Sequence, residues 1–246
     1  MSSSKASIIT RLKQDLLEWQ GFIPPAAAKA KGMGLGPIET AFPNNVFPTG
    51  TIHEMICPTP ETAAATGGLL AGLLSILMQQ GGPCLWISTC RNTFPPSLMT
   101  FDVEPDRVIF IDVQREKNVL WAMEEALKCE GIAAVIGEVR EISFAQSRRL
   151  QLAVESSKVT GFLLRNDPRK MAATTCAARW QVTALPSMLE DELPGIGFPR
   201  WQVDLLRVRN GIPGSWKLEW ADGHFIPIEE HMEAQVEEAI LQRIAG

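Results

Sequence analysis

The feature that most constrains the fold of this chain is a regular alternation of strand-like and helix-like segments between Phe47 and Arg165. Short, mostly apolar runs predict strands at 51–57, 83–89, 107–113, 132–139 and 159–165. Longer segments, several of them with apolar residues at helical spacing, predict helices at 60–80, 116–129 and 143–156. Strands that alternate with helices predict an α/β fold in which a mostly parallel sheet is flanked by helices.

The pattern changes after Asp167, where strand-like runs with partial alternation replace the α/β repeat. These runs cover 178–185, 200–209 and 215–222. The last two are joined by NGIPG, which is a turn signal, so an antiparallel extension is expected here. Amphipathic patterns predict terminal helices at 4–19 and 228–244.

These boundaries predict one main domain with extensions at both ends. An N-terminal helix and linker are expected over 1–37, the α/β core over 38–167, and the antiparallel extension with the last helix over 168–246 of the same domain. A chain of 246 residues is long enough to bury a sizeable core in this arrangement.

Composition narrows the class of partner. The formal net charge is −5, so any DNA contact is expected to be weak or indirect unless a local basic patch works against this field. The five cysteines are scattered without a CxxC pair, and no metal site is predicted. No stretch approaches about 18 uninterrupted apolar residues, so a cytoplasmic protein without membrane contact is expected.

The connection between the first strand and the first core helix is the place where a nucleotide-binding chain carries its phosphate loop. The candidate degenerate loop comprises Cys57, Pro58, Thr59, Pro60, Glu61, Thr62, Ala63 and Ala64. Against the motif GxxxxGK[ST], Cys57 and Thr62 replace the glycines. Ala63 replaces the lysine, and Ala64 replaces the hydroxyl that binds Mg²⁺. Every chemically required position of a phosphate loop is therefore changed.

The same residues form a good helix start. Thr59 suits the N-cap, Pro60 the first helical position, and Glu61 the positive end of the helix dipole. We therefore predict no tightly bound nucleotide and no other cofactor. Weak ATP binding through the helix N-terminus alone is kept as an alternative.

Longer stretches resemble known families. IETAFPNNVFPTGTIHEMICP, at 38–58, resembles the entry of RecA-type ATPase cores. RRLQLAVESSKVTGFLLR at 148–165, ARWQV at 178–182 and WQVDLLRVRNGIPGSWKLEW at 201–220 resemble the ImuA family. The likeness covers 38–220, and the arginine-rich hairpin with GIPGSW is its most specific part.

The resemblance implies a RecA-like fold and a role in bacterial, SOS-induced, error-prone translesion DNA synthesis. The partners that it implies are the RecA recombinase, an ImuB-like inactive Y-family polymerase and the error-prone polymerase complex. The chain would then act as an adaptor through protein contacts.

The resemblance also implies the positions at which a RecA-type ATPase carries its catalytic groups. Cys90 stands near the place of the glutamate that activates water, and Glu138 is the residue that the degenerate Walker B strand offers. Without the lysine, the metal-binding hydroxyl and the catalytic glutamate, phosphoryl transfer loses most of its electrostatic stabilisation. We therefore expect no ATPase activity.

Two surfaces are candidate partner interfaces. Arg207 and Arg209 match basic residues that, in RecA filaments, reach a nucleotide on the neighbouring subunit; they would otherwise be solvated charges on a strand edge. The N-terminal helix carries an apolar stripe that fits either a partner's groove or this chain's own core. The stripe comprises Ile8, Leu12, Leu16 and Trp19.

A second class of function fits the same sequence features. Cell-division inhibitors resembling SulA share a degenerate RecA-like core and bind the division GTPase. The extended C-terminal hairpin and helix favour the adaptor, because such inhibitors are generally shorter chains.

Overall fold

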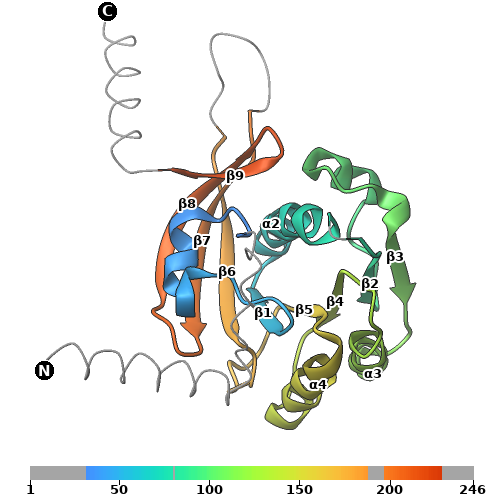
Figure 1. Ribbon diagram of the computed structural model, residues 1–246. Coiled ribbons are helices and arrows are strands. Elements are labelled where there is room, and N and C mark those ends of the chain that lie inside the picture. Colours follow the sequence, from blue (N-terminus) through green and yellow to red (C-terminus); the bar gives the residue numbers. More distant parts are fainter. Residues whose placement is uncertain (1–31, 80, 188–196, 229–246) are drawn as a thin grey trace, which may run out of the picture.

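The computed structural model describes residues 32–79, 81–187 and 197–228 (Figure 1). Its strands are β1 Ile52–Cys57, β2 Cys84–Ser88, β3 Val108–Asp112, β4 Ala134–Val139, β5 Thr160–Asn166, β6 Ala178–Leu185, β7 Arg200–Val208, β8 Gly214–Ala221 and β9 His224–Ile228. Its α-helices are α2 Pro60–Met78, α3 Glu116–Leu127 and α4 Phe144–Ser157. Short 3₁₀ helices are η1 Gly36–Ala41, η2 Pro43–Asn45, η3 Pro95–Phe101 and η4 Pro105–Arg107.

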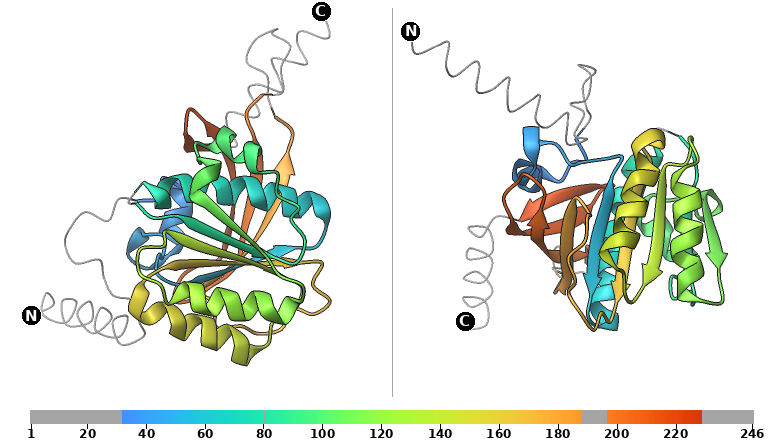
Figure 2. Two further views of the ribbon diagram at one scale, coloured as in Figure 1. Left: turned by 90° about the vertical axis from the view of Figure 1, so that its right-hand side faces the viewer. Right: turned by 90° about the horizontal axis from the view of Figure 1, so that it is seen from below.

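All strands of the described residues belong to one sheet, in the order β3-β2-β4-β5-β1-β6-β7-β8-β9. Neighbouring strands from β3 to β6 are parallel, whereas the β6–β7, β7–β8 and β8–β9 pairs are antiparallel. Helix α2 covers one face, and α3 and α4 cover the other (Figure 2). The predicted α/β class, with a RecA-like core and C-terminal antiparallel strands, is confirmed.

Two details of the C-terminal part differ from the prediction. Strand β6, which the sequence pattern placed in the antiparallel extension, pairs in parallel with β1, with Ala178 opposite His53. Strand β9 was not predicted, because Pro227 and its short length mask the pattern. Its signal was the pair Asp222 and Gly223, whose positive φ angles of 52° and 75° form the hairpin turn. Both predicted terminal helices lie largely or wholly outside the described residues.

Helix α2 is the centre of the larger hydrophobic core. It begins with a capping box, in which the side chains of Thr59 and Thr62 each bond the other's backbone N–H. Its length and apolar composition would suffice to cross a membrane, yet most of it is buried in the protein, as in the core helix of a soluble domain. Close approach explains one of its glycines: a methyl group at Gly72 would lie only 2.6 Å from the Phe225 ring of β9.

Candidate functional site

The segment that matches the phosphate-loop motif is not a loop in the structure. Strand β1 ends at Cys57 and α2 begins at Pro60, so only Pro58 and Thr59 connect them. Ala63 and Ala64, which stand at the lysine and hydroxyl positions of the motif, are inside the helix. No stretch of backbone remains to wrap around a phosphate at this connection.

The N-terminus of α2 satisfies its own hydrogen-bond donors. The Thr59 N–H donates to the Thr62 hydroxyl at 3.0 Å, and the Thr62 N–H donates to the Thr59 hydroxyl at 3.3 Å. Pro60 has no N–H. Hydrogen bonds from the Thr59 hydroxyl and from the backbone N–H of Glu61 itself lower the pKa of the Glu61 carboxyl. Glu61 lies in the first turn of α2, where its negative charge complements the positive end of the helix dipole.

Glu138, near the end of β4, lies close to this helix start. Its carboxylate accepts hydrogen bonds from Trp86 Nε1 of β2 at 2.6 Å and from Asn166 Nδ2 of β5 at 3.0 Å. Burial raises the pKa of Glu138, and the two donors only partly offset this. The negative charge of Glu138 also helps to raise the pKa of Cys57 to about 11, an effect due first to burial of the thiol. Cys57 is consequently unreactive at neutral pH.

A cleft of about 780 Å³ lies above Glu138, between α2 and the connection from β2 to η3. One wall is the small-residue face of α2, formed by Ala63, Ala64, Gly67, Gly68 and Ala71. Aromatic side chains form much of the remaining wall, namely Trp86, Phe94, Phe101 and Trp201. Phe94 is 67% exposed and stands at the rim.

The polar side chains of the cleft are neutral or acidic. Its described lining includes Asn92, Thr93, Ser97, Glu138 and Asn166, but no lysine, arginine or histidine. The Asn166 Oδ1 atom is buried and has no hydrogen-bond partner in the structure. The cleft thus presents negative charge, which is the opposite of what a phosphate requires.

Cys90 lies beside this cleft and borders a second, smaller cavity of about 280 Å³. Asn92, Glu138 and Asn166 line both cavities. The Cys90 side chain is exposed and bonds Asn92. Arg140 also lines the smaller cavity, but its guanidinium pairs with Asp167 at 2.7 Å.

Arg207 lies near the end of β7, and Arg209 lies just beyond it. Arg207 donates to the carbonyls of Thr174 and Cys176, both at 2.8 Å, and Arg209 donates to the carbonyl of Thr175. Burial, and then the charge of Arg207, lower the pKa of Arg209. Both arginines therefore hold the connection between β5 and β6, a role that the sequence did not indicate. Their contact with a partner stays a prediction.

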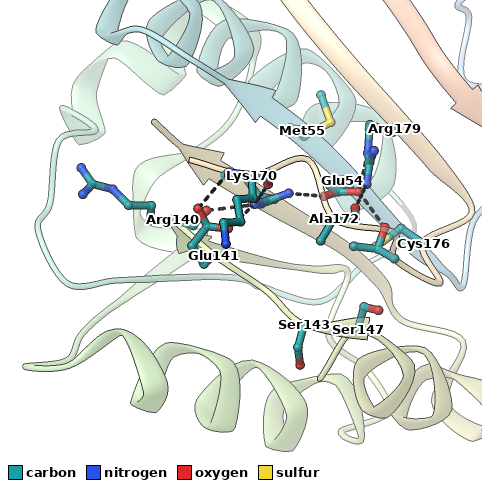
Figure 3. A network of polar contacts seen from close by, with 12 residues as sticks. Glu54, Met55, Arg140, Glu141, Ser143, Ser147, Lys170, Ala172, Cys176 and Arg179 are labelled. Carbon is teal, nitrogen blue, oxygen red and sulfur yellow. Dashed lines mark hydrogen bonds and ion pairs between the residues drawn. The ribbon is translucent and has the colours of Figure 1, made fainter. Parts of the chain in front are cut away.

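A buried ionic network, which the sequence patterns did not indicate, crosses β5, β1 and β6 (Figure 3). Arg165 and Glu54 are both fully buried and lie 3.1 Å apart. The second oxygen of Glu54 accepts from Thr174 at 2.7 Å and from Arg179 at 2.8 Å. The signal was a charged residue, Glu54 or Arg165, within each of two strands that are almost wholly buried.

Arg165 uses its other donors on neighbouring loops. Its Nη2 atom donates to the Glu141 carboxylate and to the Lys170 carbonyl, both at 2.8 Å, and Nε donates to the Arg140 carbonyl at 3.3 Å. Arg179 Nη2 donates to the Ala172 carbonyl at 2.6 Å. The network therefore fastens the connection from β5 to β6 against the sheet.

The remaining predicted residues are not placed. Ile8, Leu12, Leu16 and Trp19 lie outside the described residues. Among the residues that the structure does describe, no group of three or more His, Cys, Asp or Glu side chains could hold a metal ion.

Comparison with known proteins identifies the family. No protein-family model matches the chain. Protein ImuA of Caulobacter vibrioides strain NA1000 / CB15N is 30% identical over 194 residues, which covers 74% of this chain and 80% of the relative. Protein ImuA of Caulobacter vibrioides strain ATCC 19089 / CIP 103742 / CB 15 matches with the same values. The likeness first indicated by the arginine-rich hairpin thus extends over most of both proteins, and this chain belongs to the ImuA family.

Proposed function

We propose that this protein is a non-catalytic, RecA-like adaptor in SOS-induced, error-prone translesion synthesis. It would act in the cytoplasm through contacts with the RecA recombinase and an ImuB-like inactive polymerase, in support of an error-prone polymerase. Membership of the ImuA family supports this role, and favours it over a SulA-like division inhibitor.

The observation that supports the absence of catalysis is that the backbone N–H groups at the start of α2 already have hydrogen-bond partners within the same turn. A phosphate binds at a helix N-terminus because free backbone N–H groups point at it. Here Thr59, Thr62 and Glu61 use those groups, and Pro60 lacks one. A triphosphate would also meet the Glu61 and Glu138 carboxylates, with no described basic side chain in the adjacent cleft.

We therefore expect no heat of binding when ATP and Mg²⁺ are titrated into the full chain in a calorimeter. We also expect no ATP turnover above background. Binding with a micromolar dissociation constant would contradict the proposal. Turnover that disappears in a Glu138→Ala variant would contradict it as well, because it would identify a working Walker B position.

The adaptor part is tested in the protein's own bacterium. The tagged chain is recovered after DNA damage, and the co-purifying proteins are identified by mass spectrometry. We expect the recombinase and a polymerase-like protein. Recovery of the division GTPase would favour the inhibitor, and recovery of none of these proteins would contradict the adaptor.

The same experiment examines the two arginines. An Arg207→Ala, Arg209→Ala protein should lose the recombinase if these residues contact it. The control is Arg148→Ala, Arg169→Ala, which removes the same charge from two exposed positions. Because Arg207 and Arg209 bond backbone carbonyls, the melting temperature of each variant must be measured alongside. Normal capture by the first variant would exclude the arginine contact.

A further inference from the structure

The cleft between α2 and the connection from β2 to η3 has the electrostatics of a cation site. Glu138 is the one charged residue among the described residues that line it. A phosphate or carboxylate ligand would have no counter-charge there. A wholly apolar ligand would seal the Glu138 carboxylate away from water without a new partner, which is costly.

The floor of the cleft has unused hydrogen-bond acceptors. A carboxylate can accept about four hydrogen bonds, and Glu138 receives one on each oxygen, from Trp86 and Asn166. The neighbouring Asn166 Oδ1 atom accepts none, but it is buried out of reach of a ligand in the cleft, so the free acceptor positions are those of Glu138. The orientation of this amide follows from its contact, since the NH₂ group must face the carboxylate. The site therefore calls for a ligand that donates several hydrogen bonds.

The aromatic rings of the cleft indicate which kind of cation it would bind. The exposed ring of Phe94 and the half-buried ring of Phe101 border the cleft, and aromatic rings attract cations. A guanidinium group is planar, carries five donors and stacks on aromatic rings, whereas an ammonium group is compact and strongly hydrated. A metal ion would find only one carboxylate, and no metal-binding cluster occurs among the described residues.

We propose that this cleft is a receptor for an arginine side chain of a partner protein, whose guanidinium group binds the Glu138 carboxylate. That the partner is a protein rests on the adaptor function proposed above. The binding of a guanidinium group does not depend on that function. Folding has already removed much of the water from Glu138, so an incoming cation gains its attraction without the full desolvation cost of that carboxylate. At the carboxyl ends of its parallel strands, this protein would then hold a cation where an ATPase holds a phosphate.

The test uses N-acetyl-arginine amide as the probe and the full chain as the receptor. The indole N–H of Trp86 donates to Glu138, so its NMR resonance reports on the site; a Trp86→Phe variant assigns it. We expect a saturable shift of this resonance with N-acetyl-arginine amide. N-acetyl-citrulline amide has nearly the same shape without the charge, and should bind about tenfold more weakly or worse, because charged hydrogen bonds are the stronger ones.

Two variants complete the test. Glu138→Gln keeps a hydrogen-bond acceptor for Trp86 but removes the charge, and should abolish the preference for arginine over citrulline. Glu104→Gln removes one charge from an exposed position and should leave arginine binding unchanged. Equal binding of the two probes to the wild-type chain, or no saturable shift, would overturn the inference even if Glu138→Gln failed to fold.

The two proposals can fail separately. If the arginine probe does not bind while the recombinase and polymerase-like protein are still captured, the cleft inference is wrong and the adaptor function stands. If the probe binds with the expected selectivity while neither protein is captured, the cation site is established and the adaptor function is wrong.

Discussion

Replacing Arg165 by methionine should lower the free energy of unfolding by about 3 kcal/mol, because the change removes one of the two cationic partners of buried Glu54 and leaves only Arg179. Arg165 is fully buried, as is Glu54, which it contacts at 3.1 Å. The variant would also leave the Lys170 and Arg140 carbonyls without this donor. Denaturant unfolding at neutral pH measures the loss from the shift in midpoint at constant slope.

Arg140→Met is the matched control for this prediction. Arg140 makes its ion pair with Asp167 at a similar distance of 2.7 Å, but the two side chains are 44% and 69% exposed. Exposed pairs contribute about 0–1 kcal/mol, so a change within roughly that range is expected. A loss below about 1 kcal/mol for Arg165→Met would show that the buried network contributes little net stability, as some buried ion pairs do.

The second large effect is a loss of stability in mild acid that originates at His53. The ring is fully buried; its Nδ1 atom accepts from Trp180 Nε1 at 3.2 Å, so Nε2 carries the proton and donates to the Pro48 carbonyl at 2.7 Å. Burial lowers the pKa of His53 from 6.5 to about 4, and the bond to Pro48 offsets this only in part. The folded state therefore favours neutral His53.

The sign of the effect follows from proton uptake. Between pH 6.5 and about 4 the unfolded chain binds a proton at His53 that the folded chain does not. The contribution is complete above pH 6.5 and is lost as the pH falls toward 4. At roughly 1.4 kcal/mol per pKa unit, the gap between the two pKa values corresponds to about 3 kcal/mol.

Carboxylates titrate in the same window, so the His53 contribution must be isolated by a difference. The free energy of unfolding is measured against pH for the wild type and for His53→Gln, which keeps a donor and an acceptor. The wild-type curve should fall more steeply between pH 6.5 and 4. His224→Gln serves as the control, because His224 is exposed and should leave the slope unchanged. Parallel curves for the wild type and His53→Gln would contradict the prediction.

Much of the fold was predictable because its signals are local. The strands from β1 to β5 were predicted to within about two residues, since buried parallel strands form nearly continuous apolar runs. The start of α2 was predicted from Thr59 and Pro60, because a cap acts over three or four residues. The pairing of β6 was not predicted, because a strand pattern does not say which neighbour it joins or in which direction.

The candidate site was predictable only in part. The altered chemistry at Cys57–Ala64 and at Glu138 can be read from the sequence, because a motif states which residue type each position needs. The helix start at Thr59 and Pro60 was predicted as well, so the sequence already indicated that a helix begins where the loop would be. The sequence did not indicate the cleft beside this helix start, because its lining comes from α2, from the connection after β2 and from several strands.

By itself, the sequence determined the α/β class, the family and the loss of the phosphate-binding residues. Only the tertiary structure decided what replaces them. Trp86, Glu138 and Asn166 belong to separate strands, and the order β2-β4-β5 brings their side chains together across intervals of 52 and 28 residues. Glu54 and Arg165 meet across 111 residues in the same way. Periodicity and capping act within one element, whereas these contacts arise only when the sheet sets the order of its strands.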